Sequence, residues 1–182
     1  VDVLDIDTRK LLIRAPAGRF PDGSVWVPGA GRLFVSNELG GTETVIGGDP
    51  VRTLHSIGLG GQAGMSAYDP ISRRVLINVQ TRGEIVAVDP HTLKIVSRIT
   101  LPPACRHNHG LLVDTGDHLV FVACDGNARL ITLALPGLGS AQTPLALGED
   151  PDVLALDAAR HHLVIASESG VAVILTLAGN HA

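Results

Sequence analysis

The chain has 182 residues, of which 45% are hydrophobic and 18% are charged, and its formal net charge is -4. A protein that neutralises nucleic-acid phosphates carries clustered Lys and Arg, so this balance argues against nucleic acid as a partner. No apolar run approaches the roughly 20 residues that a membrane-spanning helix needs, so we expect no membrane span.

Short apolar runs rich in Val, Leu and Ile, punctuated by 21 Gly and 11 Pro, predict β-strands throughout the chain. No segment carries the roughly 3.6-residue apolar period of a helix over a helical length. Short strands with frequent turn signals are typical of an all-β sandwich, barrel or propeller.

In chain order, the predicted strands form repeats. Residues 1–17 have the pattern of the last two strands of one repeat. Residues 20–61, 62–104 and 105–149 each have the pattern of four strands, and residues 150–177 that of the first three strands of another repeat. This organisation predicts a single domain made of partial and whole repeats.

The second strand of each repeat shows the same motif, a polar residue followed by an apolar run that ends in a small or polar residue. The four copies are RLFVSN, RVLINV, HLVFVA and HLVIAS, and their first apolar residues are Leu33, Val75, Leu119 and Leu163. The spacings between successive copies are 42, 44 and 44 residues. Such a period is typical of the four-stranded antiparallel blade of a β-propeller.

Two stretches, EIVAVDPHTLKIVSRITLP and VDVLDIDTRKLLIRAP, resemble the YVTN-type propeller repeat. The segments RHNHGLLVD, LVFVACDGNARL, GEDPDVLALD and IASESGVAV resemble a bacterial subgroup of that family with HGL, VAC, DPDVLA and ESG motifs. The resemblance covers essentially the whole chain and implies a propeller of about seven blades. Since the chain supplies about four blades, we expect part of a larger propeller; the alternative is a closed four-bladed ring in which the N-terminal strands complete the last blade.

Polar residues gather on the loops that we expect at one end of the blades, where propellers of this architecture usually bind ligands. The candidate ligand-binding residues on these loops are His107, His109, Asp125, Asn127, Asp150, Asp152 and Glu168. Carboxylate and imidazole groups suit several divalent cations, and the candidate metal ligands are Glu38, Asn127, Asp152 and Glu168. Asp and Asn are also ordinary turn formers, so a purely structural explanation stands beside this one.

The two cysteines, Cys105 and Cys124, are predicted at the same end of one blade. A disulfide between them is geometrically allowed, and two buried thiols are the alternative. A disulfide would suit an exported protein. The family resemblance also implies a periplasmic or secreted protein, although no signal is visible in this chain.

Three functions are consistent with the sequence. The resemblance favours a non-catalytic module of the bacterial cell envelope that binds an unknown protein or small-molecule ligand at the channel mouth. The second is a metal-dependent hydrolase resembling gluconolactonase propellers, in which a cation polarises a lactone carbonyl. The third is a structural module without a ligand.

The string GLGGQA matches a dinucleotide-binding fingerprint, but a strand-like segment follows it instead of a helix, so we reject a dinucleotide site.

Overall fold

The computed structural model describes residues 1–178. Within this range the regular structure consists of β-strands and three short 3-10 turns. The strands are β1 (Asp2–Leu4), β2 (Leu11–Arg14), β3 (Pro21–Val27), β4 (Arg32–Asn37), β5 (Thr42–Gly47), β6 (Arg52–Gly58), β7 (Ala63–Asp69), β8 (Arg74–Val79), β9 (Glu84–Val88), β10 (Ile95–Thr100), β11 (Asn108–Asp114), β12 (Leu119–Cys124), β13 (Arg129–Ala134), β14 (Gly139–Ser140), β15 (Leu145–Ala146), β16 (Pro151–Asp157), β17 (His162–Ser167) and β18 (Ala172–Thr176). The 3-10 turns are η1 (Pro28–Ala30), η2 (Gln80–Arg82) and η3 (Asp125–Asn127).

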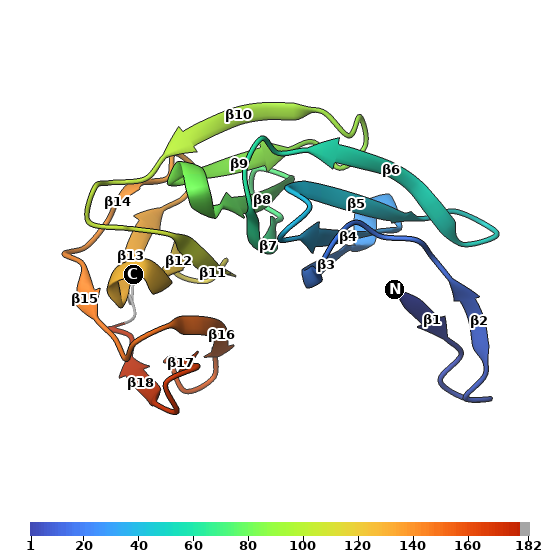
Figure 1. Ribbon diagram of the computed structural model, residues 1–182. Helices are drawn as coiled ribbons and strands as arrows, with labels where there is room; N and C mark the ends of the chain where they lie inside the picture. Colours follow the sequence, from blue (N-terminus) through green and yellow to red (C-terminus); the bar gives the residue numbers. More distant parts are fainter. Residues whose placement is uncertain (179–182) are drawn as a thin grey trace.

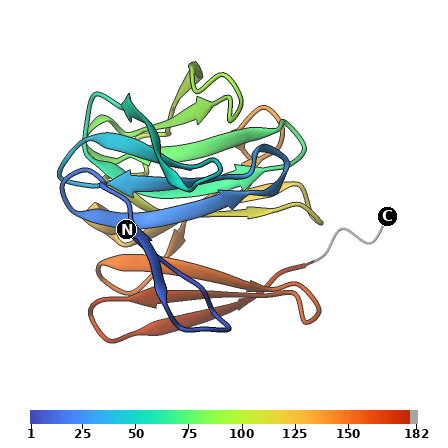
Figure 2. The same cartoon turned by 90° about the vertical axis from the view of Figure 1, so that its right-hand side faces the viewer.

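The strands form successive antiparallel sheets, each built from strands that are neighbours in the sequence. β3 to β6 form the first whole blade, β7 to β10 the second and β11 to β15 the third, and β16 to β18 form a three-stranded fourth sheet. These sheets follow one another around an arc, with the β1–β2 hairpin near one end and β16–β18 at the other (Figure 1). Turned by 90°, the sheets are seen stacked on one another (Figure 2). The chain is an all-β propeller, and each sheet falls within one of the repeats predicted from the sequence.

The N-terminal hairpin does not complete the last blade. β1 pairs with β2 in a sheet of its own, and β18 is paired with β17 in the three-stranded sheet. The alternative of a closed four-bladed ring is therefore wrong for this structure. Within residues 1–178, the strand that would follow β18 in a whole blade is not present.

Aspartates close several of the hairpin turns. The Asp69 carboxylate accepts hydrogen bonds from the backbone N–H groups of Ile71 and Ser72. Asp114 accepts in the same way from Gly116 and Asp117. Such Asx turns satisfy backbone donors that the strand ladder leaves free, which explains the DP and DTG strings between strands.

The apolar core lies between adjacent blades. Phe34 and Val45 of the first blade pack with Ile77 of the second. Between the third and fourth sheets, Phe121 packs against Leu163. Every residue of β9 is buried because blades cover both of its faces. The blade faces are thus held together chiefly by burial of apolar surface.

The fourth sheet has one covered face and one open face. Burial alternates along β18, and Ile174 and Val153 are 65% and 47% exposed on this sheet. Alternation with a two-residue period is expected when only one face of a sheet is packed. No helix among the described residues is long and apolar enough to cross a membrane.

Candidate functional site

The same hydrogen bond recurs in all four blades, each time between the loop before the first strand and the end of the second strand. It runs from the backbone N–H of the residue after the second strand to a carbonyl in the loop before the first strand, with N–O distances of 2.8 to 3.1 Å. The four donor–acceptor pairs are Glu38–Phe20, Gln80–Gln62, Asp125–His107 and Glu168–Asp150. These bonds make the loop positions of the four blades equivalent, so side chains from different repeats gather at one mouth.

The inner strands add a second set of equivalent positions. The first register pair of each inner strand is Pro21–Asn37, Ala63–Val79, Asn108–Cys124 and Pro151–Ser167. One residue further along, the four inner strands carry Asp22, Gly64, His109 and Asp152. Three of these positions therefore present a titratable side chain, and the second blade presents only a hydrogen atom.

A cavity of about 270 Å³ opens at this mouth. Its lining residues are Phe20, Asp22, Glu38, His109, Asp125, Asp150, Pro151, Asp152 and Glu168. Six of them are carboxylic acids, and none is Lys or Arg. Negatively charged carboxylates around a concave surface focus a negative potential into the cavity, and this potential attracts cations.

His109 connects three blades across the cavity. Its Nε2 lies 2.9 Å from Asp152 Oδ1 and 3.4 Å from Asp22 Oδ2, and its side chain is 12% exposed. One imidazole nitrogen therefore lies between carboxylates of the first and fourth sheets.

Gly64 allows this close arrangement. A Cβ at Gly64 would lie 2.8 Å from the His109 carbonyl oxygen and 3.0 Å from that of Asn108. The inner strands of the second and third blades therefore approach backbone to backbone, as a glycine permits.

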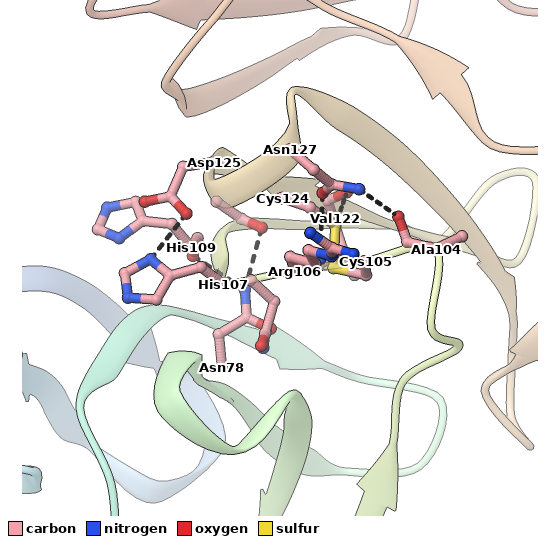
Figure 3. Close-up of a disulfide and its surroundings, with 12 residues drawn as sticks. Asn78, Ala104, Cys105, Arg106, His107, His109, Val122, Cys124, Asp125 and Asn127 are labelled. Atoms are coloured by element: carbon pink, nitrogen blue, oxygen red, sulfur yellow. Dashed lines mark hydrogen bonds and ion pairs between the residues drawn. A yellow bond between two sulfur atoms is a disulfide. The ribbon is translucent and has the colours of Figure 1, made fainter.

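His107 forms a second histidine–carboxylate pair. Its Nδ1 lies 2.7 Å from Asp125 Oδ1, and Asp125 is the first residue of η3 (Figure 3). The Asn127 amide bonds to the loop before β11 instead, donating to the Ala104 carbonyl and accepting from the Arg106 N–H. Cys105 and Cys124 form a disulfide beside them, with their Cα atoms 5.3 Å apart.

The structure brings most of the predicted site residues to the mouth. Glu38, His109, Asp125, Asp150, Asp152 and Glu168 line the cavity, and His107 lies beside it through its contact with Asp125. Asn127 does not line this cavity, because both ends of its amide are used by the neighbouring loop.

The predicted metal site does not fit the arrangement of its residues. Of the four proposed ligands, Asn127 lies outside the cavity that Glu38, Asp152 and Glu168 line. Within residues 1–178, no three His, Cys, Asp or Glu side chains are grouped closely enough to hold a metal ion. We therefore derive no chemistry from a bound metal.

Asp22, whose carboxylate lies 3.4 Å from His109 Nε2, is not among the site residues predicted from the sequence. A signal for it exists, because the dipeptide Pro-Asp occurs at 21–22 and again at 151–152, at equivalent positions of two inner strands. Aligning the repeats on these dipeptides would have placed Asp22 beside Asp152. Phe20 was missed as well, and only its equivalence to His107 and Asp150 identifies it.

Comparisons with known proteins identify the fold and leave the family open. No protein-family model matches the chain, and no curated protein matches its sequence. A putative 6-phosphogluconolactonase from Bacteroides uniformis superposes with a TM-score of 0.79 at 11% identity, over 99% of this chain and 60% of that one. Hydrazine synthase from Kuenenia stuttgartiensis gives 0.73 at 13% identity, over 90% and 47%. Dihydro-heme d1 dehydrogenase NirN gives 0.69 at 20% identity, over 98% and 42%.

The chain therefore spans about half the length of the solved structures that it matches. At these identities the similarity establishes the propeller fold and nothing about activity.

Proposed function

We propose that this chain is part of a YVTN-type propeller that binds a small cationic ligand at its acidic mouth, without catalysing a reaction. The observation that carries the proposal is the set of six carboxylic acids around a cavity of about 270 Å³ that has no Lys or Arg in its lining. The volume lies just below the usual range for ligand pockets of roughly 300 Å³ and more, which favours a small molecule.

An organic ammonium group matches this lining chemically. Each N–H of an ammonium donates a hydrogen bond, and carboxylates supply only acceptors. Phe20, which is 55% exposed and lines the same cavity, offers an aromatic ring to the ammonium group and to the methylene groups next to it. A linear diamine combines both features, because its two charged ends are joined by an apolar chain.

Repulsion among the carboxylates favours a bound cation. Ionised carboxylates around one cavity repel each other, and a cation bound among them offsets that repulsion. This attraction is screened by salt, so affinity should fall as ionic strength rises.

A metal-dependent lactonase is less well supported. Its four candidate ligands do not share one cavity, and the phosphate of a phosphorylated lactone would be repelled by the carboxylates of the lining. The similarity to putative 6-phosphogluconolactonases rests on the fold, at 11% and 12% identity. If the purified protein hydrolyses δ-gluconolactone and a chelator abolishes the activity, the lactonase function is better supported than cation binding.

We also propose that the protein works in the periplasm or outside the cell. The disulfide between Cys105 and Cys124 supports this location, because disulfides persist chiefly in oxidising compartments. The envelope role that the YVTN resemblance implies agrees with it.

Isothermal titration calorimetry tests the binding function. We would titrate the chain with 1,4-diaminobutane, with 1,4-butanediol as the uncharged control of equal length, and with Ca²⁺. We expect saturable binding of the diamine that weakens with added salt, and no binding of the diol. Equal responses to diamine and diol, or no response to any cation, would refute the proposal.

A further inference from the structure

The longest loop at the mouth is attached to its own blade by several bonds. The loop between β10 and β11 covers residues 101–107, whereas those before β7 and β16 cover only residues 59–62 and 147–150. It carries His107 and leads directly into His109. Fixing a longer loop costs more conformational entropy, so more bonds are needed to hold it in one position.

Two short segments make these bonds, and we call them together the clasp: residues 104–107 and 124–127. The disulfide joins Cys105 to Cys124. Asn127 adds two hydrogen bonds, from its Nδ2 to the Ala104 carbonyl at 2.8 Å and from the Arg106 N–H to its Oδ1 at 3.1 Å. Figure 3 shows the disulfide, Asn127 and the two histidines of the mouth within one small region.

The backbone completes the clasp. The N–H groups of Asp125 and Gly126 donate to the carbonyls of His107 and Arg106 at 3.1 and 3.2 Å. A Cβ at Gly126 would lie 2.9 Å from His107 Cβ, so the two segments are in direct contact.

The equivalent loops of the neighbouring blades have fewer attachments. In the fourth sheet, the Glu168 N–H donates to Asp150, and Ser169 Oγ donates to the Glu149 carbonyl at 2.7 Å. In the first blade, the N–H groups of Glu38 and Gly40 donate to Phe20 and Arg19, and the Gly18 N–H donates to Asn37 Oδ1. In the second blade, the Gln80 N–H donates to the Gln62 carbonyl, the Gln62 N–H to Thr81 Oγ1, and the Gln80 amide to the Ala63 carbonyl. The covalent bond belongs to the third blade, the one whose loop and inner strand supply both histidines of the mouth.

We propose that the clasp is a positioning device for the mouth: the Cys105–Cys124 disulfide and Asn127 hold His107 against Asp125, and so set where the Asp125 carboxylate faces the cavity. The cysteines precede His107 by two residues and Asp125 by one, so a shift of either segment moves the pair directly. His107 has a φ of 54°, and the equivalent residues Phe20 and Asp150 have 58° and 51°, so this left-handed conformation belongs to the propeller loop and is not produced by the clasp. The part of this proposal that concerns ligand affinity rests on the proposed function.

The test compares the C105S/C124S double variant and the N127A variant with the wild-type chain. The first readout is the ratio of hydrogen-exchange protection at the Asp125 amide to that at the equivalent Glu168 amide of the fourth sheet, measured by NMR. The second is the calorimetric affinity for 1,4-diaminobutane. V75A is the matched control, because Val75 is buried between the first two blades and does not belong to the clasp.

We expect the double variant to lower the Asp125-to-Glu168 protection ratio about tenfold and the diamine affinity about fivefold, and N127A to change both in the same direction by less. V75A should lower the melting temperature but leave the ratio and the affinity unchanged. If the ratio keeps its wild-type value in both clasp variants, the clasp only stabilises the fold and the positioning role is wrong. N127A retains the disulfide, so it decides the question if the double variant does not fold. A wild-type chain that binds no diamine would refute the proposed function, while the exchange ratio would still test the clasp.

Discussion

His109 Nε2 lies 2.9 Å from Asp152 Oδ1, which joins the inner strands of two neighbouring blades through side chains at the mouth. The same nitrogen lies 3.4 Å from Asp22 Oδ2 of the first blade. The acidic mouth is therefore assembled across the arc and belongs to no single repeat. Substitutions at this contact should change binding more than they change the stability of any one blade.

Replacing Asp152 with Asn should weaken binding of a cationic ligand. Asp152→Asn keeps the size and shape of the side chain, but removes one carboxylate from the cavity lining. We expect the dissociation constant for 1,4-diaminobutane to rise about tenfold, which corresponds to about 1.4 kcal/mol, as measured by calorimetry at low salt.

The control for this prediction is Asp157→Asn on the same strand. Asp157 pairs with His162 at the other end of the β16–β17 ladder, about 16 Å from Asp152 at roughly 3.3 Å per residue. Asp157→Asn removes the same charge as Asp152→Asn. If both variants weaken diamine binding equally, net charge alone controls binding and the position of Asp152 at the mouth does not.

The propeller repeat could be predicted from the sequence, because each blade must bury the same middle strands. The motif beginning at Leu33, Val75, Leu119 and Leu163 corresponds to β4, β8, β12 and β17, the second strands of the four sheets. The site could be predicted only in part. Loop register brings Asp150 and Asp125 to one end, but it does not specify that the Asn127 amide turns to the Ala104 carbonyl. The direction of the Asn127 side chain depends on which backbone groups of the loop before β11 are left without a partner, and the repeat pattern does not contain that information.

Gly110 should tolerate no side chain. A Cβ there would lie 2.3 Å from the Asp152 carbonyl oxygen and 2.5 Å from Leu154 Cδ1, so Gly110→Ala must push the third and fourth sheets apart. We expect a loss of about 1–3 kcal/mol in the free energy of unfolding, measured by urea denaturation. Gly58→Ala is the matched control, since no atom lies within 4 Å of a Cβ at that strand position. A Gly110→Ala variant as stable as Gly58→Ala would contradict the close packing described for this interface.

The open face of the fourth sheet should drive self-association of the isolated chain. Ile174 is 65% exposed on β18, and exposed apolar sheet faces bind to each other. We expect Ile174→Ser to shift sedimentation-velocity profiles towards monomer at high concentration without lowering the melting temperature. Leu163→Ser is the contrasting variant, because Leu163 is fully buried and its substitution should unfold the sheet instead. If Ile174→Ser leaves the association unchanged, the surface around Ile174 is not part of the self-association interface.

A buried carboxyl group should make stability depend on pH. Glu43 on β5 is fully buried, and its Oε2 accepts a hydrogen bond from Ser36 Oγ at 2.9 Å. Burial in the protein interior raises the pKa of Glu43 to about 8 from the ordinary value of 4.5. At neutral pH the folded chain therefore holds a proton at Glu43 that the unfolded chain releases.

The sign of the pH effect follows from this proton. The folded state binds it more tightly, so the contribution to stability is fully present below about pH 4.5 and is lost as pH rises through about 8. Glu43→Gln keeps the size of the side chain but cannot ionise. We expect the stability of the variant relative to wild type to increase by on the order of 3 kcal/mol between pH 5 and pH 8, as measured by urea denaturation.

Ile57→Val serves as the control for Glu43→Gln, because Ile57 is the cross-strand partner of Glu43 and carries no titratable group. It should cost about 0.5–1.5 kcal/mol at every pH, since only a buried methyl group is lost. The comparison with wild type cancels the titration of all other groups. If the offset of Glu43→Gln is as constant with pH as that of Ile57→Val, Glu43 is ionised in the folded protein, and the blade interface around Ser36 must then stabilise a buried negative charge.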